Sequence, residues 1–231
     1  TLLSAFVALS MLALPGTSSA DIYSQNFDGF ADGTTDLGDG SVMAGTANVQ
    51  GGALELTRDG VAGGFASFSV PPLANSSLGW TATFDLTIID GEGANEPADG
   101  MSFNYGNAAL GTLGAAEEGM AVADASENLS FEIDTWMNLD AEQGVNISGN
   151  AAGADVGELA FLNGSILSDG TEVGGKVTAS WSPATGATFE TNGLLTNAGG
   201  PDFTDVATTF TPDDAFTFIM SGRVGGANET K

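Results

Sequence analysis

The sequence Leu-Ser-Phe-Glu-Ile-Asp-Thr-Trp-Met-Asn-Leu-Asp, residues 129–140, predicts a β-strand with acidic side chains on one face. Side chains alternate between the two faces of a strand. The expected faces are Phe131, Ile133 and Thr135 on one side, and Glu132, Asp134, Trp136 and Asn138 on the other. Two carboxylates two positions apart lie about 7 Å from each other and repel unless a cation or a shared proton lies between them. The segment therefore predicts a metal site, a hydrolytic pair of acids or two solvated acids.

Other short alternating segments predict an all-β protein. Turn-forming residues, including 34 glycines, separate runs rich in Phe, Val, Ile, Thr and Trp. We expect strands at Trp80–Ile89, Met101–Tyr105, Val177–Trp181 and Phe216–Met220, with weaker candidates at Ala53–Thr57, Phe65–Val70, Gly144–Ser148, Ala187–Thr191 and Val206–Phe210. Ser182–Gly186 predicts a hairpin turn, and the one helical candidate is Ala115–Ala125. One-sided alternation in many strands favours two sheets packed face to face.

The composition excludes several classes of function. The 231 residues include 30 acidic and 4 basic residues, a formal net charge of −26. Such a chain repels phosphate backbones and anionic lipid heads, so we expect no nucleic-acid partner and no membrane insertion by the mature domain. The absence of Cys and His excludes thiolate zinc sites and Ser-His or Cys-His nucleophiles. Oxygen ligands remain, and these suit calcium, magnesium or manganese.

Residues 1–20 predict a secretory signal peptide. Leu2–Leu14 is apolar but too short to span a bilayer as a helix, and the small residues Ser18, Ser19 and Ala20 follow before Asp21. We therefore expect a secreted or cell-surface protein whose single domain covers residues 21–231. The alternative is a buried first strand or helix.

Two motifs stand out, Ala98-Asp99-Gly100 followed by an apolar strand, and Phe131–Asn138, which is similar to an E-x-D-T-aromatic-x-N strand. Together they resemble the concanavalin A-like lectin/glucanase superfamily, in particular its legume-lectin-like branch and bacterial secreted members. Ser221–Glu229 resembles the turn before the last strand. The resemblance implies a jelly-roll β-sandwich of two antiparallel sheets, and we expect the sequence to stop before the last strand.

The resemblance also implies a metal site at the end of the acidic strand. The implied ligands are the side chains of Glu132, Asp134, Asn138 and Asp140 and the main-chain carbonyl of Trp136, with Glu142 as the alternative to Asp140. The histidine of the family's transition-metal site has no counterpart, and Gly144 stands near its place. We therefore expect Ca²⁺ rather than Mn²⁺.

The same resemblance implies a glycan partner. Asp99, Gly100 and Asn138 would contact sugar hydroxyls, because a carboxylate forms strong charge-assisted hydrogen bonds. The aromatic side chain expected beside the sugar has three candidates, Tyr105, Trp136 and Trp181. Taken one at a time, Asp99-Gly100 and Asn138 are more typical of turns, and Glu132 and Asp134 are more typical of two solvated acids on an open sheet face.

Glycoside hydrolysis is the third functional alternative. The glucanase branch places a nucleophile and an acid/base on one strand, and the position of the acid/base falls here on Met137 or Trp136, neither of which transfers protons. We therefore expect a non-catalytic, lectin-like or adhesive module. Its main competitor is a structural surface β-sandwich that binds no sugar.

Overall fold

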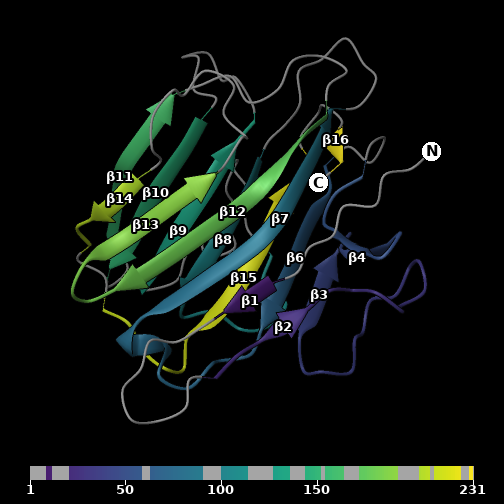
Figure 1. The fold of residues 1–231 in the computed structure, drawn as a ribbon, viewed down its shortest axis with the longest axis horizontal. Helices are drawn as coiled ribbons and strands as arrows, with labels where there is room; N and C mark the ends of the chain where they lie inside the picture. The colour runs from purple at the N-terminus through teal and green to yellow at the C-terminus, as the bar shows by residue number, and fades with distance from the viewer. Residues whose placement is uncertain are drawn as a thin grey trace.

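Two antiparallel sheets make up the structure, which is a computed structural model. It describes residues 9–11, 21–58, 63–90, 100–113, 127–135, 144–151, 154–163, 172–191, 203–208, 211–224 and 229–230. In Figure 1 the strands of one sheet, including β7, β12 and β13, lie over those of the other, including β6, β8, β9 and β15. The all-β fold class is therefore confirmed. Among the described residues, no helix is long and apolar enough to cross a membrane.

The first sheet, sheet A, runs in the order β14 (Phe203–Val206), β13 (Gly186–Thr191), β12 (Glu172–Ser182), β7 (Trp80–Asp90), β1 (Leu9–Met11) and β2 (Ser24–Gln25). Strand β16 (Glu229–Thr230) also pairs with β7. The expected turn between Ser182 and Gly186 joins β12 to β13. Leu9–Met11 pairs with β7 and β2, while the removal of residues 1–20 as a signal peptide stays a prediction.

Sheet B runs in the order β11 (Ala154–Asn163), β10 (Gly144–Ala151), β9 (Glu127–Asp134), β8 (Gly100–Gly106), β15 (Thr217–Arg223), β6 (Phe65–Val70) and β3 (Val42–Gly45). A small third sheet pairs β4 (Asn48–Gln50) with β5 (Ala53–Glu55), and Ser76–Leu78 forms one 3-10 turn. The acidic strand is β9, and it ends at Asp134 rather than continuing to Asp140. The predicted helix at Ala115–Ala125 lies outside the described residues.

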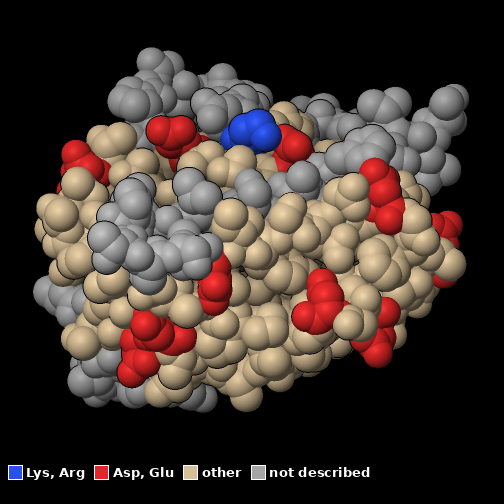
Figure 2. Space-filling view, turned by 60° about the horizontal axis from the view of Figure 1, so that its bottom comes forward, with Lys and Arg blue, Asp and Glu red and all other residues tan. Residues whose placement is uncertain are grey.

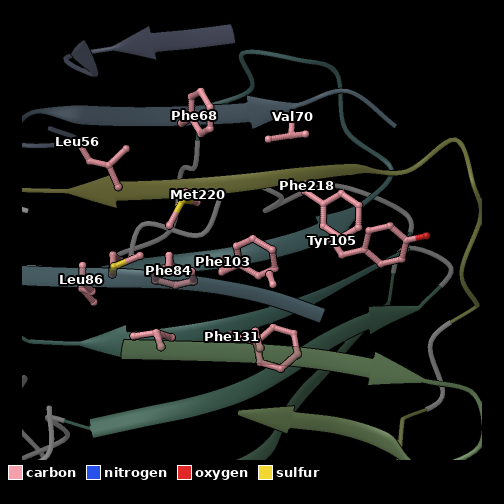
Figure 3. Close-up of a cluster of buried hydrophobic side chains, with 14 of the residues drawn as sticks. Leu56, Phe68, Val70, Phe84, Leu86, Phe103, Tyr105, Phe131, Phe218 and Met220 are labelled. Atoms are coloured by element: carbon pink, nitrogen blue, oxygen red, sulfur yellow. The ribbon is translucent and has the colours of Figure 1, made fainter. Parts of the chain in front are cut away.

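The core lies between the two sheets and is rich in aromatic rings. The Trp80 ring of sheet A lies 5.4–5.7 Å, between centroids, from four rings of sheet B, those of Phe103, Tyr105, Phe131 and Phe218. Figure 3 shows these four side chains beside Phe68, Val70, Phe84, Leu86 and Met220. Strand alternation sends these apolar residues inward, so the intervening residues of β8, β9 and β15 face the other side of sheet B.

Candidate functional site

The strand register brings the two predicted motifs side by side. Gly100, Asp134 and Gly144 form one row across β8, β9 and β10, at the end of sheet B where β8 begins and β9 ends. The next row on this face joins Ser102 to Glu132. Residues thirty or more positions apart in the sequence, such as Gly100 and Asp134, thus become neighbours.

Glycine flanks Asp134 on both neighbouring strands. Gly100 has a φ of 151°, a backbone conformation that favours glycine. Because neither Gly100 nor Gly144 carries a side chain, no Cβ atom flanks Asp134 in this row of the sheet. A cation or a ligand can approach the backbone closely at such a point.

Glu132 is buried although it faces away from the main core. Its relative exposure is 3%, whereas Phe131 and Ile133 on the core side are each 1% exposed. A buried carboxylate is tolerated only where hydrogen bonds, an opposite charge or a metal ion compensate for the lost water. The interpretation of Glu132 as a solvated acid is therefore wrong.

A buried polar network runs beside Glu132 on the same face of the sheet. The Asn128 amide donates to the Ser130 hydroxyl at 3.2 Å, and the Ser130 hydroxyl donates to the Asn104 carbonyl. The Asn104 amide donates to Ser102 Oγ at 2.9 Å, and Ser102 Oγ lies 3.2 Å from Ser221 Oγ. A network of this kind fixes side-chain positions, because each buried polar group needs its partner. In the sequence, the alternation of polar residues with aromatic residues in β8 and β9 indicates that these polar side chains share one face of the sheet.

Most of the predicted ligands lie outside the described residues. This holds for Asp99, Trp136, Asn138 and Asp140, for the alternative ligand Glu142 and for the side chain of Asp134. Met137, at the acid/base position of the glucanase alternative, also lies outside them. Within the described part of the chain, no three acidic side chains come together as a metal site. The full site therefore stays a prediction, and of its predicted residues the structure places Gly100, Glu132 and the backbone of Asp134.

Two of the three aromatic candidates are wrong. Tyr105 is fully buried between the sheets, where its hydroxyl donates to the Asp213 carbonyl at 2.7 Å and lies 2.9 Å from Ser76 Oγ. Burial raises the pKa of Tyr105 above its ordinary value. Trp181 is 3% exposed. It pairs with Trp80 at the start of β7, in sheet A, whereas the predicted site lies in sheet B. A sugar needs an open aromatic face, so Trp136 is the candidate that remains.

These features define a β-sandwich of the concanavalin A-like lectin fold, and known structures support this assignment. The VIP36 exoplasmic/lumenal domain in its Ca²⁺/Man3GlcNAc-bound form matches with a TM-score of 0.61 and 15% identity, over 84% of this chain and 81% of that one. The metal-free form of lectin I-B4 from Griffonia simplicifolia matches with a TM-score of 0.53 and 16% identity, over 85% and 92%. Basic winged bean lectin with Tn-antigen matches with a TM-score of 0.53 and 13% identity, over 86% and 91%.

These matches establish the fold, since their identities are low. No protein-family model matches the sequence, and no curated protein matches it. Of these similar proteins, the VIP36 domain is bound to Ca²⁺ and Man3GlcNAc, and the winged bean lectin is bound to Tn-antigen.

Proposed function

We propose that this protein is a secreted, non-catalytic carbohydrate-binding protein whose glycan site, with Ca²⁺, lies where β8 begins and β9 ends. The observation that carries the proposal is the row of Gly100, Asp134 and Gly144, with the buried Glu132 in the next row. The lectin fold of the similar structures supports it.

Calcium suits the oxygen atoms that the sequence supplies at this point. The carboxylates of Asp134 and Asp140, the side chain of Asn138 and the carbonyl of Trp136 would hold the ion, and Glu132 would lie beside them. Ca²⁺ takes six to eight oxygens in flexible geometry, so a loop can supply several of them. When bound, the ion would fix the shape of this loop.

Sugar hydroxyls would then meet the carboxylate of Asp99, the backbone at Gly100 and the amide of Asn138. The absence of a side chain at Gly100 supports a close approach of the ligand to the backbone. Hydrolysis is not proposed, because Met137 or Trp136 stands where a glucanase needs its proton donor.

Calcium-dependent melting tests the metal site. A ligand that binds only the folded state at a hundred times its Kd stabilises that state by about 2.7 kcal/mol. We expect millimolar calcium to raise the Tm of the wild type but not of Asp134→Ala. The matched control is Asp85→Ala, which removes an exposed acid of sheet A that pairs with Lys176. Equal calcium shifts in wild type and Asp134→Ala would contradict the proposed site.

A glycan array with and without a chelator tests the sugar site. We expect glycan binding that is lost with the chelator, with Asp134→Ala and with Asp99→Asn. Calcium stabilisation without any glycan binding would instead support the structural sandwich. Release of reducing ends from β-glucans that Glu132→Gln abolishes would support the hydrolase.

Secretion is tested on the expressed chain. Cleavage between Ala20 and Asp21 is the expected result, read from the mass of the exported protein. An exported protein that retains residues 1–20 would contradict the predicted signal peptide.

A further inference from the structure

A cavity of about 320 Å³ lies at the turn between β12 and β13. Its walls come from three separate segments, namely the hairpin turn itself, the residues at the end of β14 and Pro212 before β15. Pockets that bind small ligands have volumes from about 300 Å³ upward, so this one suits a ligand of a single ring.

This pocket is separate from the proposed glycan site. Pro212 precedes the start of β15, and Thr217 at that start pairs with Gly106 at the end of β8. The proposed glycan site lies at the opposite end of β8, at Gly100. In Figure 1 the turn between β12 and β13 lies at the lower left, whereas β9 points upward to its end at Asp134.

Hydrogen bonds fix the polar walls of the pocket. The Trp181 indole N–H donates to Thr208 Oγ1 at 3.0 Å and joins β12 to the segment after β14. Across the turn, the hydroxyls of Ser182 and Thr185 lie 2.8 Å apart, and the Thr185 amide donates to Ser182 Oγ at 3.1 Å. A wall that is already ordered loses little entropy when a ligand binds.

A β-bulge places an acid in this wall. Ala187 pairs with Val206 but Phe189 pairs with Phe203, so β14 holds one residue more than its partner over this interval. Asp205 lies in that interval with a φ of 54°, and its amide donates to Thr188 Oγ1 at 3.3 Å. Bulges redirect side chains beside functional sites, and the redirected residue here lines the pocket.

The charge of the pocket selects its ligand. Among the described residues that line the pocket, Asp205 is the acidic one, and none is a lysine or an arginine. An anion is therefore repelled, and an ammonium group forms a charge-assisted hydrogen bond. The hydroxyls of Ser182, Thr185 and Thr208 both donate and accept, as ring hydroxyls require, and Pro212 offers carbon to the face of a ring.

We infer that this pocket binds a monosaccharide with a free amino group, a hexosamine, independently of the proposed calcium-dependent site. The ammonium group contacts Asp205, and the ring hydroxyls contact the hydroxyl side chains of the hairpin turn. Acetylation of the amine removes its charge, and so it removes the attraction to Asp205.

Calorimetric titration with D-glucosamine, D-glucose and N-acetyl-D-glucosamine tests the inference. All titrations contain a chelator, so a failure of the calcium-dependent glycan site does not affect the result. The wild type is expected to bind glucosamine at least tenfold more tightly than the two uncharged sugars. Absence of glucosamine binding, or equal binding of all three sugars, would overturn the inference.

Two variants with the same change in charge locate the binding. Asp205→Asn keeps a residue that tolerates positive φ and is expected to weaken glucosamine binding at least tenfold. Asp36→Asn removes one exposed acid outside the pocket and is expected to leave binding unchanged. Equal losses in both variants would show general attraction to an acidic surface and would overturn the inference. Unchanged Tm values confirm that both variants are folded.

Discussion

At the scale of the residue, Asp39 shows how hydrogen bonds set the pH range of stability. Desolvation raises its pKa, but hydrogen bonds from Ser41, Tyr23 and Gln25 outweigh this and hold the pKa of Asp39 below its ordinary value. The Tyr23 hydroxyl donates to Asp39 Oδ2 at 2.9 Å, and the Tyr23 ring packs on Phe68 of the core. The Tyr23 side chain therefore joins two parts of the chain, the loop that contains Asp39 and strand β6 of sheet B.

The pH dependence of unfolding checks this contact. Because the folded-state pKa is lowered, the carboxylate stabilises the fold above the unfolded-state pKa of about 4, and this contribution is lost as the pH falls through the folded-state value. Asp39→Asn should therefore reduce the free energy of unfolding by about 1 kcal/mol at neutral pH and by much less in acid. Urea unfolding of both proteins across this pH range measures the difference. A difference that grows toward low pH would contradict the assignment.

Glu132 shows what alternation alone predicts and what it misses. The sequence places Glu132 on the face opposite Phe131 and Ile133, and the structure confirms this. Its burial depends on what covers that face of the sheet, and such coverage is a tertiary property. For the same reason, sequence alone did not separate the buried rings of Tyr105 and Trp181 from a ring that is open to a sugar.

At the scale of the element, the strands with unbroken alternation were predicted well. Phe65–Val70 matches β6 at both ends, and Trp80–Ile89 is one residue short of β7. Strand β11 was missed, since Gly157 interrupts its pattern and its pairing with β10 contains register shifts. Strand β14 begins at Phe203, whereas the sequence predicts a strand that begins at Val206. The bulge at Asp205 interrupts the alternation of side chains that would indicate the earlier start. Bulges of this kind depend on the partner strand, which the local sequence does not reveal.

The turn that ends β3 gives a prediction at this scale. Gly45 has a φ of 67°, and an added Cβ would overlap the main-chain carbonyl of Phe65 on β6. Gly33 has a φ of 83°, but a Cβ there would meet nothing within 4 Å. Gly33→Ala should therefore cost only the conformational penalty of about 1–2 kcal/mol, and Gly45→Ala about 3 kcal/mol or more. Urea unfolding measures the free energy of unfolding of both variants. Equal decreases would contradict the expected clash between the new Cβ at position 45 and the Phe65 carbonyl.

At the scale of the whole molecule, the surface carries far more negative than positive charge. Figure 2 shows acidic side chains spread over one face with little basic surface among them. The ion pairs found among the described residues, Arg58 with Glu55 and Lys176 with Asp85, involve basic side chains that are about half exposed, so they add little stability. The net charge of −26 therefore opposes the compact state through self-repulsion.

Screening of this repulsion is separable from binding at the proposed calcium site. Sodium chloride shortens the range of repulsion between exposed acids, so Tm should rise from low salt to about 0.15 M, by about 2–4 °C for each 1 kcal/mol gained. Magnesium at matched ionic strength should act largely through screening, because it dehydrates reluctantly and demands octahedral geometry. Calcium should raise the Tm of the wild type further, whereas in Asp134→Ala the two divalent ions should act alike. Differential scanning fluorimetry measures the Tm of both proteins in sodium chloride, magnesium and calcium. Equal effects of calcium and magnesium on the wild type would mean that charge screening alone explains any stabilisation by calcium.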